Sequence, residues 1–214
     1  MVRKFILLLL FLLIICSLSL NYFFYKYISS QNVVVEVVDG DTFQLAGGKR
    51  VRLMGVDVPE YDRCGGKEAK NRLSELILDK KVTLKEEVKE GYGRTLALVY
   101  ADNKFINEIM MREGWGRADY RKNSQREKLT KAFHLAQKEK LGIFSGLCRE
   151  EGSPPFSECN IKGNIDKNTY EKFYHLPGCS QYDEVVIEKD LGEGYFCTEE
   201  EAVSAGFKRA SGCP

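Results

Sequence analysis

The residues of this chain best suited to chemistry begin with two aspartates that interrupt a strand-like stretch. Residues 33–45 read VVVEVVDGDTFQL, and the apolar run breaks at Asp39-Gly40-Asp41-Thr42. Carboxylates and glycine are poor strand formers, so the break has either a structural or a chemical reason. Asp and Gly are common in tight turns, whereas carboxylate oxygens also suit a divalent cation. The local sequence leaves both interpretations open.

Further candidates lie at the end of another strand-like stretch and in a later glycine-rich segment. The sequence RVRLMGVDVPE supplies Arg52, Asp57 and Glu60, and GYGRTLALVY supplies Tyr92 and Arg94. Each has an ordinary structural interpretation, because an arginine on a half-exposed strand is usually solvated and Asp-Val-Pro-Glu suits a turn before a helix. Taken one at a time, these residues favour structure over chemistry.

The elements that must position these residues alternate between strands and helices. Apolar residues at helical spacing predict helices over 67–79 and 106–113. A third helix is predicted from the capping box Ser124 and Glu127 to the C-cap Gly142. Five short strands with about three helices predict an α+β domain, and this strand count suits a small barrel. The predicted strands are 33–38, 42–45, 49–56, 82–87 and 96–100.

Several separated motifs, in order and in register, resemble the thermonuclease (staphylococcal nuclease-like) family. They are VVDGDTF, VRLMGVDVPE, GKEA, GYGRTLALVY, INEIMMREGWGRADY and AQKEKLGIF, and together they cover about residues 33–148. A combination in register is far more specific than any single motif. The resemblance implies a five-stranded OB-fold-like β-barrel with three helices, and a metal-dependent phosphodiesterase activity.

The resemblance also implies a metal site. Asp41 and Asp57 match the family's calcium-binding carboxylates, and the backbone carbonyl of Val58 matches a third ligand. Ca²⁺ prefers hard oxygen ligands and keeps several waters, so these groups suit an open site. The residues of the first turn expected to support the site are Asp39, Gly40 and Thr42.

Catalytic and substrate-binding roles follow from the same resemblance. Glu60 matches the residue that activates or positions the attacking water, and Arg52 and Arg94 match the two arginines that clamp the phosphate. Planar guanidinium groups suit phosphate oxygens and stabilise the charge of the transition state. Tyr92 and Tyr120 match tyrosines near the bound nucleotide, where a ring can stack on a base. Simple packing is the alternative for both tyrosines.

The N-terminal segment is separate from the globular part. Arg3 and Lys4 precede an uncharged run over residues 5–25, and a bilayer requires on the order of 20 apolar residues. This pattern favours an uncleaved membrane anchor with its N-terminus inside; a cleaved signal peptide is the alternative. Both interpretations export the chain. The predicted division is 1–27 for the anchor or signal, 28–148 for the nuclease-like domain, 149–158 for a linker and 159–214 for a small Cys-rich module.

Export predicts that the cysteines form disulfides, because an oxidising compartment favours these bonds. Exported members of the family often carry cysteines at two matching places, so the resemblance implies a Cys64–Cys148 bond. The tail of about 55 residues is too small to fold readily without covalent links.

Four cysteines lie in the tail, and four cysteines allow three connectivities. The favoured pairs are Cys159–Cys197 and Cys179–Cys213. A zinc site that combines His175 with tail cysteines is the alternative.

Together these features predict a Ca²⁺-dependent extracytoplasmic nuclease that hydrolyses phosphodiester bonds of DNA and/or RNA as a monomer. The rivals are a non-catalytic nucleic-acid-binding OB module and a DNA-uptake or partner-binding surface component. Degenerate relatives lose the acids and arginines that this chain retains. The formal net charge of +1 carries no information about partners, and no long charge block indicates a nucleic-acid-binding tail.

Overall fold

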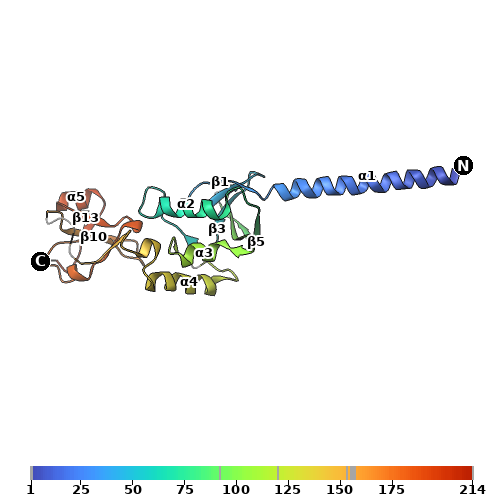
Figure 1. The fold of residues 1–214 in the computed structure, drawn as a ribbon. Coiled ribbons are helices and arrows are strands. Elements are labelled where there is room, and N and C mark those ends of the chain that lie inside the picture. Colours follow the sequence, from blue (N-terminus) through green and yellow to red (C-terminus); the bar gives the residue numbers. More distant parts are fainter. Residues whose placement is uncertain (1, 92, 120, 153, 155–157, 214) are drawn as a thin grey trace.

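The fold combines helices and short strands, as the hydrophobic periodicity predicts. The computed structural model describes residues 2–91, 93–119, 121–152, 154 and 158–213 (Figure 1). The α-helices are α1 (Val2–Ser30), α2 (Gly66–Ile77), α3 (Ile106–Arg112), α4 (Arg126–Lys138) and α5 (Glu199–Ser204). The 3₁₀ helices are η1 (Gly142–Phe144), η2 (Tyr182–Glu184) and η3 (Lys189–Leu191). The strands are β1 (Val34–Val37), β2 (Thr42–Leu45), β3 (Arg50–Leu53), β4 (Val56–Asp57), β5 (Val82–Lys89), β6 (Thr95–Ala101), β7 (Lys104–Phe105), β8 (Arg117–Ala118), β9 (Arg149–Glu150), β10 (Ile161–Ile165), β11 (Lys172–His175), β12 (Ile187–Glu188), β13 (Gly194–Phe196) and β14 (Lys208–Arg209).

The central sheet has the strand order β1-β2-β3-β6-β5, with β7 paired to β6. It therefore holds six strands, where the sequence predicts a closed barrel of five. Within the described part of the chain the barrel is not closed, and the two outer strands approach each other through an isolated bridge between Val33 and Lys81. The short β1 pairs with β2 on both sides of a register shift between Val34 and Glu36.

Three helices cover the sheet and complete its core. α2 buries Ala69, Leu73 and Ile77, the face that the spacing predicts. α4 lies against α3 (Figure 1) and buries Leu129 and Phe133 among other residues. Apolar burial at about 25 cal/mol per Å² is the main favourable contribution to this arrangement. The sheet and helices thus form one core from which the candidate site residues project.

The predicted ends of the third helix are wrong. α4 begins at Arg126 with Gln125 at its N-cap, and no side-chain cap bond forms there. Ser124 lies one residue before the N-cap, and its backbone N–H donates to the Glu86 carboxylate of β5 at 3.0 Å. At the other end the helix stops before Glu139, and Gly142 instead opens η1. A contact with a distant strand thus holds the segment that was predicted to cap the helix.

Asn107 is a buried polar residue that links three parts of the core. It is fully buried, and its Oδ1 accepts from the Val99 N–H at 2.8 Å. Its Nδ2 donates to the Met54 and Ala97 carbonyls at 2.9 and 3.2 Å. This side chain therefore provides hydrogen-bond partners for the buried Val99 N–H of β6 and for the Met54 carbonyl in the turn after β3, while the Ala97 carbonyl also accepts from the Met54 N–H.

We expect Asn107→Ala to lower the free energy of unfolding by about 3 kcal/mol, because it leaves buried backbone groups unsatisfied. Urea denaturation followed by the fluorescence of the single tryptophan, Trp115, measures the change. Asn71→Ala is the matched control, since Asn71 is exposed on α2. Equal stabilities for the two variants would contradict the assigned role of Asn107.

The N-terminal residues form one long helix that leads away from the sheet (Figure 1). The predicted membrane span over residues 5–25 lies within this helix. Among the helices in the described part of the chain, none has the combined length and apolar content that crossing a bilayer requires. The prediction of a span is therefore not confirmed.

The C-terminal part forms a second, smaller body at the end of the molecule opposite α1 (Figure 1). Its four strands pair in the order β13-β10-β11-β14 around a small core. α5 begins with a side-chain cap, because Thr198 accepts from the Glu201 N–H at 3.2 Å. One expectation differs from the structure: residues 149 and 150 of the predicted linker form β9, which pairs with β12.

Three disulfides stabilise the two bodies, one bond in the first body and two in the C-terminal body. They join Cys64 to Cys148, Cys159 to Cys197 and Cys179 to Cys213, the pairs favoured above. All four tail cysteines are thereby oxidised, so they offer no thiolate for the alternative zinc site.

Candidate active site

The two predicted metal-ligand aspartates converge on one arginine. Asp41 immediately precedes β2, and Arg52 stands on β3 opposite Thr42 in the antiparallel pair. Arg52 Nη2 lies 2.8 Å from Asp41 Oδ2 and 2.8 Å from Asp57 Oδ1. Strand pairing thus brings together two acids that are separated in the sequence, and a single cationic nitrogen bridges them.

The environment of Asp41 is unusual for a carboxylate. Its side chain is only 4% exposed, whereas that of Asp57 is 64% exposed. Burial raises the pKa of Asp41 to about 7; the Arg52 charge opposes this shift and the Asp39 charge adds to it. Thr42 Oγ1 donates to Asp41 Oδ1 at 2.7 Å, and Asp39 Oδ1 accepts from the Asp41 N–H at 3.0 Å. A cation bound here would be stabilised by the buried Asp41 carboxylate and by the neighbouring Asp39 charge, so this environment favours a cation site.

Gly40 is required by close packing rather than by its backbone conformation. Its φ is not in the left-handed region. A Cβ at this position would lie 2.4 Å from a Val58 methyl group and 2.7 Å from the Ala69 Cβ. The absence of a side chain therefore lets the aspartate turn contact the segment that follows β4, where the third predicted ligand lies.

Arg94, the second predicted phosphate clamp, is held by Glu90. Arg94 Nε and Nη2 each lie 3.1 Å from Glu90 Oε2, and Arg121 Nη1 lies 2.6 Å from Glu90 Oε1. Burial alone would raise the pKa of Glu90, but the Arg121 hydrogen bond and the charges of Arg94, Arg121 and Arg52 together hold it below its usual value. Glu90 therefore lies within electrostatic reach of both predicted phosphate-clamping arginines.

Glu60 lies in the loop between β4 and α2. Its side chain is exposed, and it lines a cavity of about 120 Å³ together with Asp57 and Val58. The loop closes tightly on the start of α2, since a Cβ on Gly66 would lie 2.0 Å from the Glu60 carbonyl oxygen. An exposed carboxylate on a tightly packed loop is accessible to water and substrate. The predicted substrate-binding tyrosines Tyr92 and Tyr120 lie outside the described residues.

The donor set fits a hard cation with open coordination. Among the described residues, no group of three or more His, Cys, Asp or Glu side chains gathers as a metal site. Two carboxylates that already share one cationic nitrogen, with a nearby backbone carbonyl, leave the remaining positions to water. Such a set of oxygen ligands suits Ca²⁺. Asp41, Asp57 and the Val58 carbonyl are the groups that would hold the ion.

Other residues of this region are not recognisable from the sequence. Glu90 has only the four-residue spacing to Arg94 as a local signal. Arg63, Arg117 and Asp190 line the same cavity as Glu60. Asp190 belongs to the C-terminal body, so no local pattern connects it with the acids of the sheet.

Acids and arginines gathered at one end of a small mixed sheet are the composition of a site for cations and phosphate groups. A family model described as "Staphylococcal nuclease homologue" matches residues 50–146. The micrococcal nuclease of Shigella flexneri is 34% identical over 126 residues, which cover 52% of this chain and 72% of that protein. The thermonuclease of Staphylococcus hyicus is 37% identical over 125 residues, which cover 52% of this chain and 74% of that protein. The staphylococcal-like nuclease CAN1 of Arabidopsis thaliana is 31% identical over 123 residues, which cover 56% of this chain and 34% of that protein.

The chain belongs to the family of staphylococcal nuclease homologues. This membership implies an OB-like fold for the central sheet, here with the sheet left open. The matched residues end at 146, so the C-terminal body lies beyond the family model.

Proposed function

We propose that this protein is a Ca²⁺-dependent nuclease that hydrolyses phosphodiester bonds of DNA and/or RNA. The observation that carries the proposal is the position of Arg52 Nη2, 2.8 Å from both Asp41 and Asp57. Two carboxylates that can bind a cation and an arginine that can bind phosphate thus lie in one site. The names of the relatives, which are nucleases, support the same class of reaction.

Each residue has a distinct task in this mechanism. The bound ion would supply Lewis-acid polarisation of the phosphate. Arg52 and Arg94 donate hydrogen bonds to phosphate oxygens and stabilise the charge that develops in the transition state. Glu60 accepts the proton of the attacking water, a task that suits an exposed carboxylate lining the same cavity as Asp57.

We place the protein outside the cytoplasm. Three disulfides are the supporting observation, because such bonds persist in oxidising compartments and are rare in reducing ones. Alkylation of free thiols in cells, followed by mass spectrometry, tests this location. Reduced cysteines at these six positions would contradict it.

The activity test uses the full chain purified under oxidising conditions. We expect cleavage of single- and double-stranded DNA in the presence of Ca²⁺, and its loss when a chelator removes the ion. Mg²⁺ is the matched control, because it demands a stricter octahedral geometry than Ca²⁺. Cleavage that persists in chelator would contradict the metal requirement. Binding of DNA and RNA without cleavage of either under every condition would contradict the nuclease assignment and favour a non-catalytic binding module.

A further inference from the structure

The C-terminal body borders the candidate active site. The cavity of about 120 Å³ beside Glu60 is lined on one side by residues 57–60 and on the other by Asp190 and Leu191. The latter two belong to η3, which lies far along the chain from the acids of the sheet. A wall of the proposed catalytic pocket is therefore supplied by a part of the chain that the family model does not cover.

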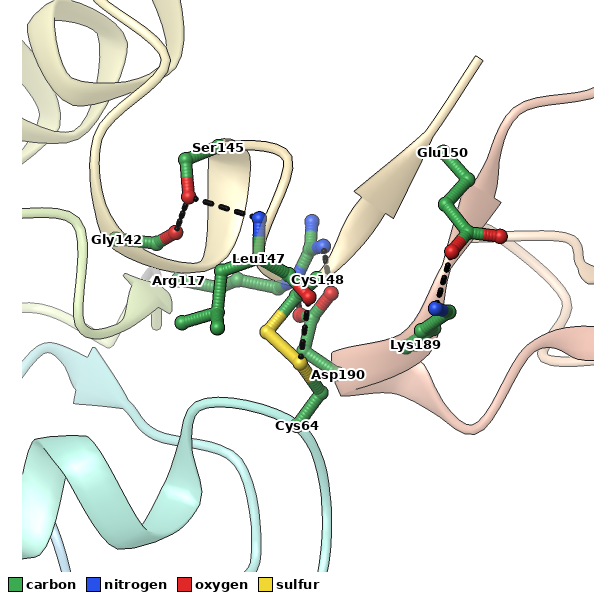
Figure 2. The surroundings of a disulfide bond; sticks show 9 residues. All are labelled: Cys64, Arg117, Gly142, Ser145, Leu147, Cys148, Glu150, Lys189 and Asp190. Atoms are coloured by element: carbon green, nitrogen blue, oxygen red, sulfur yellow. Dashed lines mark hydrogen bonds and ion pairs between the residues drawn. A yellow bond between two sulfur atoms is a disulfide. The ribbon is translucent and has the colours of Figure 1, made fainter. Parts of the chain in front are cut away.

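Arg117 is the main connection between the two bodies. Its Nε lies 2.8 Å from Asp190 Oδ2 and its Nη2 lies 3.1 Å from Asp190 Oδ1 (Figure 2). Its Nη2 also lies 3.3 Å from Glu188 Oε1, and the guanidinium stands over the Phe144 ring at 5.3 Å. The Asp190 side chain is 1% exposed and that of Arg117 is 17% exposed. A bidentate pair at this depth has a fixed geometry and is screened little by solvent.

Arg117 is also the backbone partner of a proposed metal ligand. β8 pairs with β4 in a ladder of two residues, in which Arg117 lies opposite Asp57. This ladder is separate from the central sheet. A two-stranded ladder of this length is not stable by itself, so its position depends on side-chain contacts. The contact between Arg117 and Asp190 is the best ordered of these by burial and geometry.

The loop between β4 and α2, which carries Glu60, is also held at the end nearer to α2. Arg63 Nη1 donates to the Leu191 carbonyl at 2.9 Å. Next to it, Cys64 is bonded to Cys148 (Figure 2), and the Cys148 carbonyl accepts from the Lys189 N–H at 2.8 Å. The loop that carries Glu60 is thus held by Leu191 at Arg63, and its β4 end is linked to Asp190 through Arg117 of β8.

We propose that Asp190 is a positioning residue of the nuclease site: through Arg117 it fixes β8 and β4, and thereby the placement of Asp57 and Glu60. The proposal rests on the proposed nuclease function. It makes the C-terminal body a structural part of the catalytic site rather than an appended module.

The test compares Asp190→Asn with wild type in the full chain. We expect kcat for DNA cleavage to fall by about 10- to 100-fold while KM changes by less than about threefold, because misplacement by about 1 Å costs rate rather than binding. Hydrogen exchange supplies a second measurement that needs no activity. Amide exchange over residues 57–63 should become faster, while exchange in β5 stays unchanged.

Glu171→Gln is the matched control, because it also removes one carboxylate of an ion pair in the C-terminal body. Its partner is Lys208 at 2.6 Å, and both side chains are about half exposed. This variant should keep wild-type kcat and exchange. Arg117→Lys keeps the charge but loses the bidentate geometry, so it should repeat the effect of Asp190→Asn and provides the test if that variant does not fold.

Unchanged exchange over residues 57–63 together with wild-type kcat in Asp190→Asn would overturn the proposal. The exchange measurement separates this outcome from failure of the proposed function. A protein that cleaves neither DNA nor RNA would refute the nuclease assignment, yet exchange would still report whether Asp190 holds the loop.

Discussion

Replacing Glu60 by Gln is expected to lower kcat for DNA cleavage by about 10²- to 10⁴-fold, the range that a positioned general base contributes. The amide keeps the size of the side chain but cannot accept the proton of the attacking water. Because Glu60 is exposed, the free energy of unfolding should change by less than about 0.5 kcal/mol. The loss of rate would then reflect chemistry and not folding.

Two measurements separate this role from the alternatives. Steady-state cleavage of a labelled oligonucleotide gives kcat, and fluorescence anisotropy of the same oligonucleotide in chelator gives binding. We expect the dissociation constant to stay within about twofold of wild type, since the substitution removes an interaction of the transition state only. Glu139→Gln is the matched control, because Glu139 is an exposed glutamate at the end of α4. A wild-type kcat in the Glu60 variant would show that Glu60 is not the general base.

The proximity of Asp41 and Arg52 could be predicted from neighbouring strands, whereas the roles of these residues were implied by the family resemblance. Asp41 precedes β2 and Arg52 lies on β3, and a short hairpin joins these strands, so their proximity follows from the register of β2 and β3. Asp57 follows in the next strand, β4. Such local pairings are encoded by alternation and turn residues, which one sequence displays directly.

The contacts that the sequence did not reveal are non-local. Ser124 has the sequence of a helix cap, but Glu86 of a distant strand accepts its N–H. Asp190 reaches Arg117 across 73 residues of sequence. A five-stranded barrel was predicted, yet the sheet stays open, and the residues just before β1 and β5 meet in the isolated bridge between Val33 and Lys81. Local patterns carry no information about such competition between distant groups.

Removing the disulfide between Cys64 and Cys148 is expected to have the largest effect on stability. The two cysteines are 84 residues apart, and the chain-entropy model assigns about 4.5 kcal/mol to the closure of such a loop. Cys148 is fully buried beside the core, so Cys64→Ala/Cys148→Ala also removes packing. We expect a loss of about 4 kcal/mol or more in the free energy of unfolding, a large fraction of the stability of a typical domain.

Urea denaturation followed by Trp115 fluorescence measures this loss, because Trp115 packs against the core of the first body. Cys16→Ala is the control for the chemical change itself, since Cys16 is exposed and unpaired. Cys159→Ala/Cys197→Ala removes a bond that lies within the C-terminal body, and its effect on Trp115 fluorescence should be much smaller. If the Cys64 and Cys148 variant unfolds at the same urea concentration as wild type, the loop is held by noncovalent contacts such as that between Arg63 and Leu191. If it unfolds much earlier, the covalent bond and those contacts act together to keep Glu60 in the cavity that Asp57 also lines.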